Sequence, residues 1–143
     1  MILVIALVVI GVLAVGMIVM VGLERGPSPA DVAVSYEHAW DVLDFGTLWV
    51  LSGREMRDGL DRRSFVKAKK AAYADSDGMS KLAAGVQVDD VAIVDDDATV
   101  ITSLALREGS AVCNEIRLRR RNLRWEVVSY SLNRPSQPNE SAS

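Results

Sequence analysis

The sequence has few of the residues that build metal centres, disulfides or nucleophilic dyads. It contains one cysteine, Cys113, and one histidine, His38. A single cysteine excludes an intrachain disulfide and a cysteine-based zinc site, and one histidine gives no basis for a histidine cluster or a Cys–His pair. We therefore expect no metal, no cofactor and no catalytic residue of these types. Cys113 is interpreted as a small buried hydrophobe, and His38 as a surface residue.

The chain also lacks an excess of positive charge. Its 16 basic and 19 acidic residues give a net charge of −3. Nucleic-acid binding depends on a dominant positive field, so we expect no nucleic-acid partner.

Charge is absent altogether from residues 1–23, and every Asp, Glu, Lys, Arg and His follows them. Crossing the hydrocarbon of a bilayer takes roughly 20 apolar residues, and this run leaves no polar face for an amphipathic surface helix. A cleavable signal peptide would begin with positive charge and carry a shorter apolar stretch. The sequence predicts an uncleaved, single-pass transmembrane anchor that places the protein in the cell membrane.

The flanks of this anchor carry too little charge to fix its orientation. Only Arg25, beside Glu24, follows the apolar run, and taken alone it would favour a cytoplasmic domain. A long following domain is translocated largely regardless of charge, so we expect an extracytoplasmic domain and leave the other orientation open.

The remaining chain divides into a linker at 24–30, an α+β domain at 31–132 and a polar tail at 133–143 that we expect to be disordered.

A helix is predicted over 29–43, with an apolar stripe formed by Val32, Tyr36, Trp40 and Leu43. Glu37, His38 and Asp41 lie off that stripe. The sequence "TLWVL" predicts a short turn capped by Thr47. "SGRE" (52–55) matches a capping box that starts a second helix, and Asp61 is the expected cap of a third.

From residue 86 the hydrophobic period changes to two, which predicts strands at 86–94, 98–107, 111–120 and 123–132. In the third strand Asn114 is in register with Val112, Ile116 and Leu118, so its amide should face inward and need partners. Helices followed by an antiparallel meander predict about three helices packed on one face of a curved four-stranded sheet.

This order of elements resembles the NTF2-like proteins of the cystatin-like superfamily. The resemblance rests on "YEHAWDVLDFGTLWVLS", "LDRRSF" and "NLRWEVV", and on the spacing between them. The chain is also similar to the small membrane-tethered members of that group, common in actinobacteria and of unassigned function. The resemblance implies a cone in which the bent sheet wraps a long helix, often with a pocket at the open end.

Family enzymes of the ketosteroid-isomerase and polyketide-cyclase (SnoaL-like) types place an Asp or His and a Tyr inside that cone, a set this sequence does not clearly supply. The candidates for a pocket lining are Tyr36, Trp40, Asp41, Asp44, Trp49, Asn114 and Trp125. Each has a structural alternative: core packing for the aromatics, helix-end solvation for the carboxylates, and a satisfied buried amide for Asn114.

The segment "RLRRRNLR" (117–124) concentrates basic residues on one hairpin. Its candidates for binding anionic lipid or an acidic partner are Arg117, Arg119, Arg121 and Arg124. The alternative is an exposed face balanced by Glu115, Glu126 and the acidic residues at 95–97.

These observations favour a non-catalytic, membrane-tethered binding or accessory module. An isomerase-like or cyclase-like enzyme or ligand carrier using the cone pocket is the first alternative. A membrane-apposed scaffold using the arginine hairpin is the second. The expected partners are the bilayer, through residues 1–23, and either a protein partner or a second copy of the chain, through the sheet.

Overall fold

The computed structural model describes residues 26–75 and 83–133. It contains α2 (Pro29–Asp41), α3 (Phe45–Leu51), a 3-10 turn η1 (Arg54–Met56) and α4 (Arg62–Ala72), followed by β1 (Ala83–Val94), β2 (Asp97–Leu106), β3 (Ala111–Arg121) and β4 (Arg124–Asn133). The predicted anchor at 1–23 and the tail from residue 134 lie outside the described residues. Within 26–75 and 83–133, no helix is long and apolar enough to cross a membrane.

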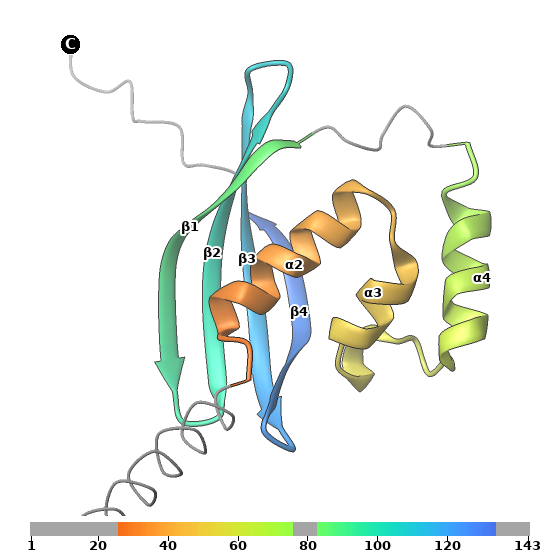
Figure 1. The fold of residues 1–143 in the computed structure, drawn as a ribbon, viewed down its shortest axis with the longest axis horizontal. Coiled ribbons are helices and arrows are strands. Elements are labelled where there is room, and N and C mark those ends of the chain that lie inside the picture. The colour runs from red at the N-terminus through yellow and green to blue at the C-terminus, as the bar shows by residue number, and fades with distance from the viewer. Residues whose placement is uncertain (1–25, 76–82, 134–143) are drawn as a thin grey trace, which may run out of the picture.

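The four strands form one antiparallel sheet in the order β1-β2-β3-β4, and the helices lie on one side of it (Figure 1). Helix α2 crosses the sheet face directly, α3 lies beside it, and α4 packs against α3 (Figure 1). The predicted α+β architecture, with helices on one face of a four-stranded meander, is therefore confirmed.

Side-chain caps define where the helices begin. Ser28 and Asp31 form a reciprocal capping box at the start of α2. Asp61 caps α4 as predicted, because its carboxylate accepts from the backbone N–H of Ser64. The cap predicted at Thr47 was wrong: Asp44 caps α3 and accepts hydrogen bonds from both the backbone N–H and the hydroxyl of Thr47.

The capping box predicted at 52–55 was also wrong. Ser52 instead forms a parallel bridge with Val127 at the edge of β4, and the Gly53 N–H donates to the Val127 carbonyl at 2.7 Å. A β-carbon at Gly53 would lie 2.7 Å from Glu55 Oε2, 3.2 Å from Val128 Cγ1 and 3.3 Å from Arg121 Nη1, so a larger residue there would have to displace the ends of these side chains. The segment that follows forms only the short η1.

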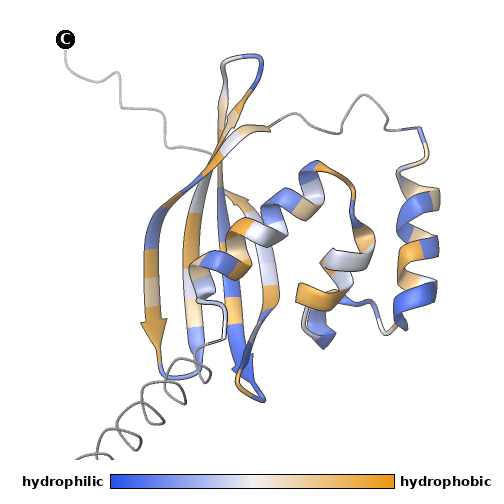
Figure 2. Ribbon diagram, viewed as in Figure 1, coloured by the Kyte–Doolittle hydropathy of each residue, from blue (hydrophilic) through white to orange (hydrophobic). Residues whose placement is uncertain are grey.

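The core lies between α2 and the inner face of the sheet. The predicted helical stripe is confirmed at Val32 and Tyr36, which are buried, while Trp40 and Leu43 pack half-buried against the core. The alternation predicted for β2 and β3 is confirmed as well, with the buried side chains Val100, Thr102, Asn114, Ile116 and Leu118. Figure 2 shows the corresponding alternation of hydrophobic and hydrophilic segments along the strands.

Candidate functional site

Four polar side chains meet inside the cone. Glu37, from α2, accepts hydrogen bonds from Thr102 Oγ1 (2.7 Å) and Asn114 Nδ2 (2.8 Å) at its Oε1 atom. The Tyr130 hydroxyl donates to Glu37 Oε2 at 3.0 Å and lies 2.9 Å from Asn114 Nδ2. We call these four residues the Glu37 cluster.

The strands bring the donors of the Glu37 cluster together by register. Thr102 of β2 is directly opposite Asn114 of β3. Tyr130 of β4 is opposite Ile116, the next inward-facing residue of β3 after Asn114. Glu37 is 1% exposed, Thr102 0% and Asn114 1%. Glu37, which helical spacing placed off the apolar stripe, is therefore buried, and the inward orientation predicted for Asn114 is confirmed.

The Glu37 carboxylate is held by neutral donors only, because the cluster contains no cation. A buried carboxylate needs several hydrogen bonds to offset the loss of hydration, and three donors supply them here. Because three side chains from three strands converge on one carboxylate, the cluster ties α2 to β2, β3 and β4 simultaneously.

Burial raises the pKa of both tyrosines next to this carboxylate. For Tyr130 the negative charge of Glu37 and the hydrogen bond to it raise the pKa further. The pKa of Tyr36 is also raised by burial, and the nearby polar atoms of Trp40 and Ser52 offset part of the rise. The two rings are in contact, with centroids 5.6 Å apart.

These shifts predict a loss of stability in alkali. Both tyrosines have a higher pKa in the folded protein than the ordinary tyrosine value of 10.0, so below that pH neither state ionises and the free energy of unfolding is unaffected. Above it the tyrosines of the unfolded chain ionise first, and the free energy of unfolding falls as the pH rises. We expect Tyr130→Phe to cost about 1 kcal/mol at neutral pH, through the lost hydrogen bond, and to raise the midpoint of alkaline unfolding. Fluorescence-monitored unfolding against pH measures both effects, and an unchanged alkaline midpoint would contradict the prediction.

Three buried polar atoms in and around the Glu37 cluster are not satisfied by the described residues. Trp40 Nε1, Ser52 Oγ and Asn114 Oδ1 are buried and have no hydrogen-bond partner among residues 26–75 and 83–133. Trp40 and Ser52 lie on the Tyr36 side of the interior and Asn114 lies in the cluster. Buried polar atoms of this kind are commonly satisfied by an ordered water.

The two predicted pocket carboxylates are both at the ends of helices. Asp41 Oδ1 accepts from the backbone N–H of Ala83 at 2.9 Å and so fixes the start of β1. Asp44 caps α3, and its hydrogen bonds with Thr47 hold the pKa of its carboxyl below the usual value. Neither carboxylate is part of the Glu37 cluster.

The predicted aromatic candidates lie in the core or against it. Tyr36 is buried in the core, and Trp40, Trp49 and Trp125 pack half-buried against it. The Trp49 ring is covered by the Arg57 guanidinium, 3.9 Å from its centroid, and the indole of Trp125 lies 5.5 Å from the guanidinium of Arg120. Of the predicted candidates, only Asn114 is in the Glu37 cluster, with Tyr36 beside it.

Two hollows lie on either side of the outer face of α2. A cleft of about 530 Å³ separates α2 from the start of β1 and includes Asp41 and Arg107. A second hollow, of about 410 Å³, lies on the α3 side and includes Asp44 and Thr47. Both are lined by Val34 and His38 of α2 and by Val42, the residue that caps its C-terminus. These three residues stand about one turn apart and form the ridge between the hollows.

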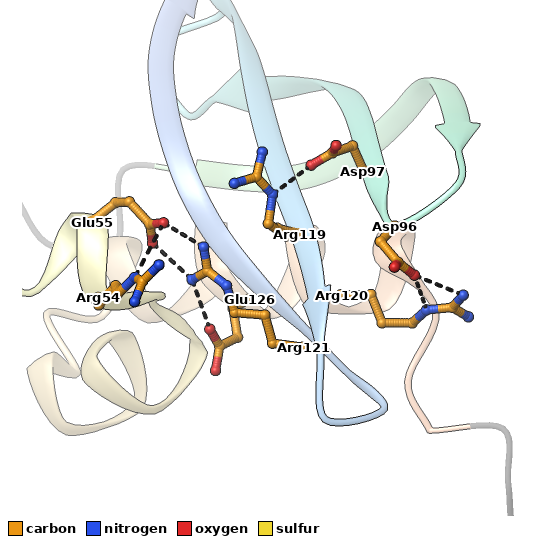
Figure 3. Close-up of polar contacts among 8 residues, drawn as sticks. All are labelled: Arg54, Glu55, Asp96, Asp97, Arg119, Arg120, Arg121 and Glu126. Atoms are coloured by element: carbon orange, nitrogen blue, oxygen red, sulfur yellow. Dashed lines mark hydrogen bonds and ion pairs between the residues drawn. The ribbon is translucent and has the colours of Figure 1, made fainter.

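The arginine hairpin is largely paired with carboxylates (Figure 3). Arg119 bonds Asp97 at 2.8 Å, and Arg120 bonds Asp96 at 2.9 Å. Arg121 bonds Glu55 at 2.5 Å and Glu126 at 3.4 Å, and its hydrogen bond lowers the pKa of Glu55 to about 2.

The two remaining arginine candidates differ from each other. Arg117 bonds Glu115 at 2.8 Å, whereas Arg124 makes no ion pair within residues 26–75 and 83–133. Charge balance by neighbouring acids, the structural alternative for the hairpin, thus accounts for most of these side chains. In the same described part of the chain, no group of three or more His, Cys, Asp or Glu side chains is placed to hold a metal ion.

Comparison with solved structures places the fold. A candidate NTF2-like transpeptidase from Campylobacter jejuni matches with a TM-score of 0.55 at 12% identity, over 71% of this chain and 97% of that one. A SEC-C motif containing protein from Rhodopseudomonas palustris matches with a TM-score of 0.51 at 19% identity, over 73% of this chain and 77% of that one. No protein-family model and no curated protein matches the sequence. At these identities the likeness concerns the fold alone, and the domain has an NTF2-like fold.

Proposed function

We propose that this protein is a non-catalytic binding or accessory module, an NTF2-like domain tethered to the cell membrane by residues 1–23. The observation that carries the proposal is the state of the interior. The carboxylate, amide and hydroxyls that converge there are bonded to one another, and Glu37 is 1% exposed. An enzyme of the isomerase or cyclase type needs its acid or base within reach of a substrate.

We place binding on the outer face of α2. The Val34–His38–Val42 ridge presents an imidazole between two apolar side chains, with a hollow on each side. Concave, partly apolar surfaces with a few polar groups are typical of binding sites.

Photo-crosslinking in intact cells tests the binding face. The full-length protein would carry a photoreactive amino acid at position 38, with a matched exposed position on α4, Lys67, as the control. We expect one discrete crosslinked species at position 38, abolished by Val42→Asp, and none at position 67. Equal crosslinking at both positions, or none at 38, would contradict this placement.

Orientation has its own test. We propose an extracytoplasmic domain, so protease added to intact spheroplasts should digest it. Protection until the cells are lysed would show a cytoplasmic domain and leave the binding proposal untouched.

A second candidate is a ligand carrier or enzyme that uses the interior. It is favoured by Trp40 Nε1, Ser52 Oγ and Asn114 Oδ1, three buried atoms with no hydrogen-bond partner in the described part of the chain. A small hydrogen-bonding ligand would satisfy the same atoms as a water. If this candidate is right, native mass spectrometry of the gently purified full-length protein should show a bound small molecule that Asn114→Leu removes.

A further inference from the structure

We propose that the end of the sheet carrying the β1–β2 and β3–β4 turns rests on the bilayer, with the side chains of Leu123 and Val94 inserted into its interfacial layer. The inference builds on the proposed membrane tether. It adds a second contact, made by the folded domain itself, that would fix how the domain is presented.

The start of the described chain lies at this end of the sheet. A β-carbon added at Gly26 would lie 3.6 Å from the carbonyl oxygen of Leu123, in the β3–β4 turn. The predicted anchor ends at residue 23, and three residues of extended chain span about 10 Å. A chain leaving the bilayer at Leu23 therefore brings the β3–β4 turn to within about this distance of the membrane surface.

The β1–β2 turn lies beside the β3–β4 turn. The Arg120 N–H donates to the Asp96 carbonyl at 2.7 Å, and Asp97 is opposite Arg119 in the sheet register. Both turns are at the bottom of the sheet in Figure 1, and the β2–β3 turn is at the opposite end. A membrane close to Gly26 would therefore meet both turns together.

Both turns carry large exposed hydrophobic side chains. Leu123 is 77% exposed and Val94 70%, and the neighbouring Ile93 is 55% exposed. Arg119 and Arg120 at this end bond Asp97 and Asp96, whereas Asp95 and Arg124 make no ion pair within residues 26–75 and 83–133, so the turns carry no excess of positive charge. Contact through apolar side chains therefore explains this end better than attraction to anionic lipid does.

The backbone at Leu123 is strained, and no packing of its side chain within the domain offsets that strain. Asn122 and Leu123 have φ values of 49° and 63°, in the left-handed region where hairpin turns favour asparagine followed by glycine. A leucine there is unfavourable, and its exposed side chain gains almost no packing within the domain. An apolar phase outside the domain would bury this side chain and offset the strain. The bilayer is the apolar phase that the proposed tether brings nearest to it.

Spin labels can measure the contact. The full-length protein with Cys113→Ser, in phosphatidylcholine nanodiscs, would carry a label at Leu123 or Val94. The matched control is Leu132, a leucine 72% exposed near the other end of β4. We expect labels at 123 and 94 to collide more often with oxygen than with a water-soluble nickel chelate, at low and high salt, and the label at 132 to behave as in water.

The possible outcomes separate this proposal from the tether. Failure of the protein to enter nanodiscs would overturn the tether, and water-like labels at 123 and 94 in a protein that does enter them would overturn only the second contact. Strong spin–spin coupling at 123 would indicate a second copy there instead of lipid. Leu123→Gly gives a further readout. This variant should unfold at an equal or higher temperature, yet a label at position 94 should become more exposed to the chelate. A label at 94 that keeps its depth in the membrane would show that Leu123 does not contribute to the contact.

Discussion

Replacing Glu37 by leucine should lower the free energy of unfolding by about 3 kcal/mol. Each buried donor that loses its acceptor costs roughly 1–3 kcal/mol, and rearrangement of the surrounding side chains recovers part of that cost. Thr102 and Tyr130 would lose their hydrogen-bond acceptor, and Asn114 would keep only its contact with Tyr130. Urea unfolding of the full-length protein in mild detergent, followed by tryptophan fluorescence, measures the change.

Two variants separate this effect from a loss of volume. Glu37→Gln keeps one acceptor oxygen and should cost less than the leucine variant. Combining Glu37→Leu with Thr102→Val removes the stranded hydroxyl of Thr102 and keeps the contact between Asn114 and Tyr130, so it should recover part of the lost stability, since removing both partners is far less costly than removing one. A double variant less stable than Glu37→Leu would show that the Thr102 hydroxyl has another partner.

Replacing Phe65 by alanine should release α4 from the domain. Phe65 is the only fully buried side chain of this helix, and α4 packs against α3 without extensive contact with the sheet. Trp40, Phe45 and Tyr73 form an aromatic cluster alongside, with centroids 5.7 to 6.3 Å apart. A buried Phe→Ala change typically costs about 3 kcal/mol or more, and most of that should appear as local opening of α4.

Amide hydrogen exchange gives the pattern that distinguishes local from global loss. We expect exchange in α4 to accelerate by roughly two powers of ten, the equivalent of about 3 kcal/mol, while β3 keeps its protection. The control, Lys67→Ala on the exposed face of the same helix, should leave exchange nearly unchanged. Equal acceleration in α4 and β3 would mean that the helix and the sheet unfold as one unit.

The sheet was predictable because β2 and β3 alternate along their length and are separated by short polar turns. The observed strands at 97–106 and 111–121 differ from those expected by only a residue or so. The capping box at 52–55 failed because the match to S-x-x-E is local, whereas Ser52 is held by a distant strand through Val127. A tertiary contact of this kind leaves no periodic signal.

Glu37 was missed for a related reason. Helical spacing placed it beside the apolar stripe, and a glutamate there is usually solvated. The available signal lay elsewhere: Thr102 and Asn114 occupy inward positions of adjacent strands, and two buried polar side chains require a polar partner from the layer above. That argument predicts a polar residue on the helix face but does not choose between Glu37 and its neighbours, because the choice depends on how α2 is rotated over the sheet.

The central claim of the proposed function and of the proposed membrane contact is attachment to the membrane, and alkaline carbonate extraction tests it most directly. Membranes from cells producing the full-length protein would be compared with those from cells producing residues 24–143. We predict that the full-length protein stays in the membrane pellet after extraction and that the shortened chain is soluble. Full-length protein released by carbonate would contradict the account.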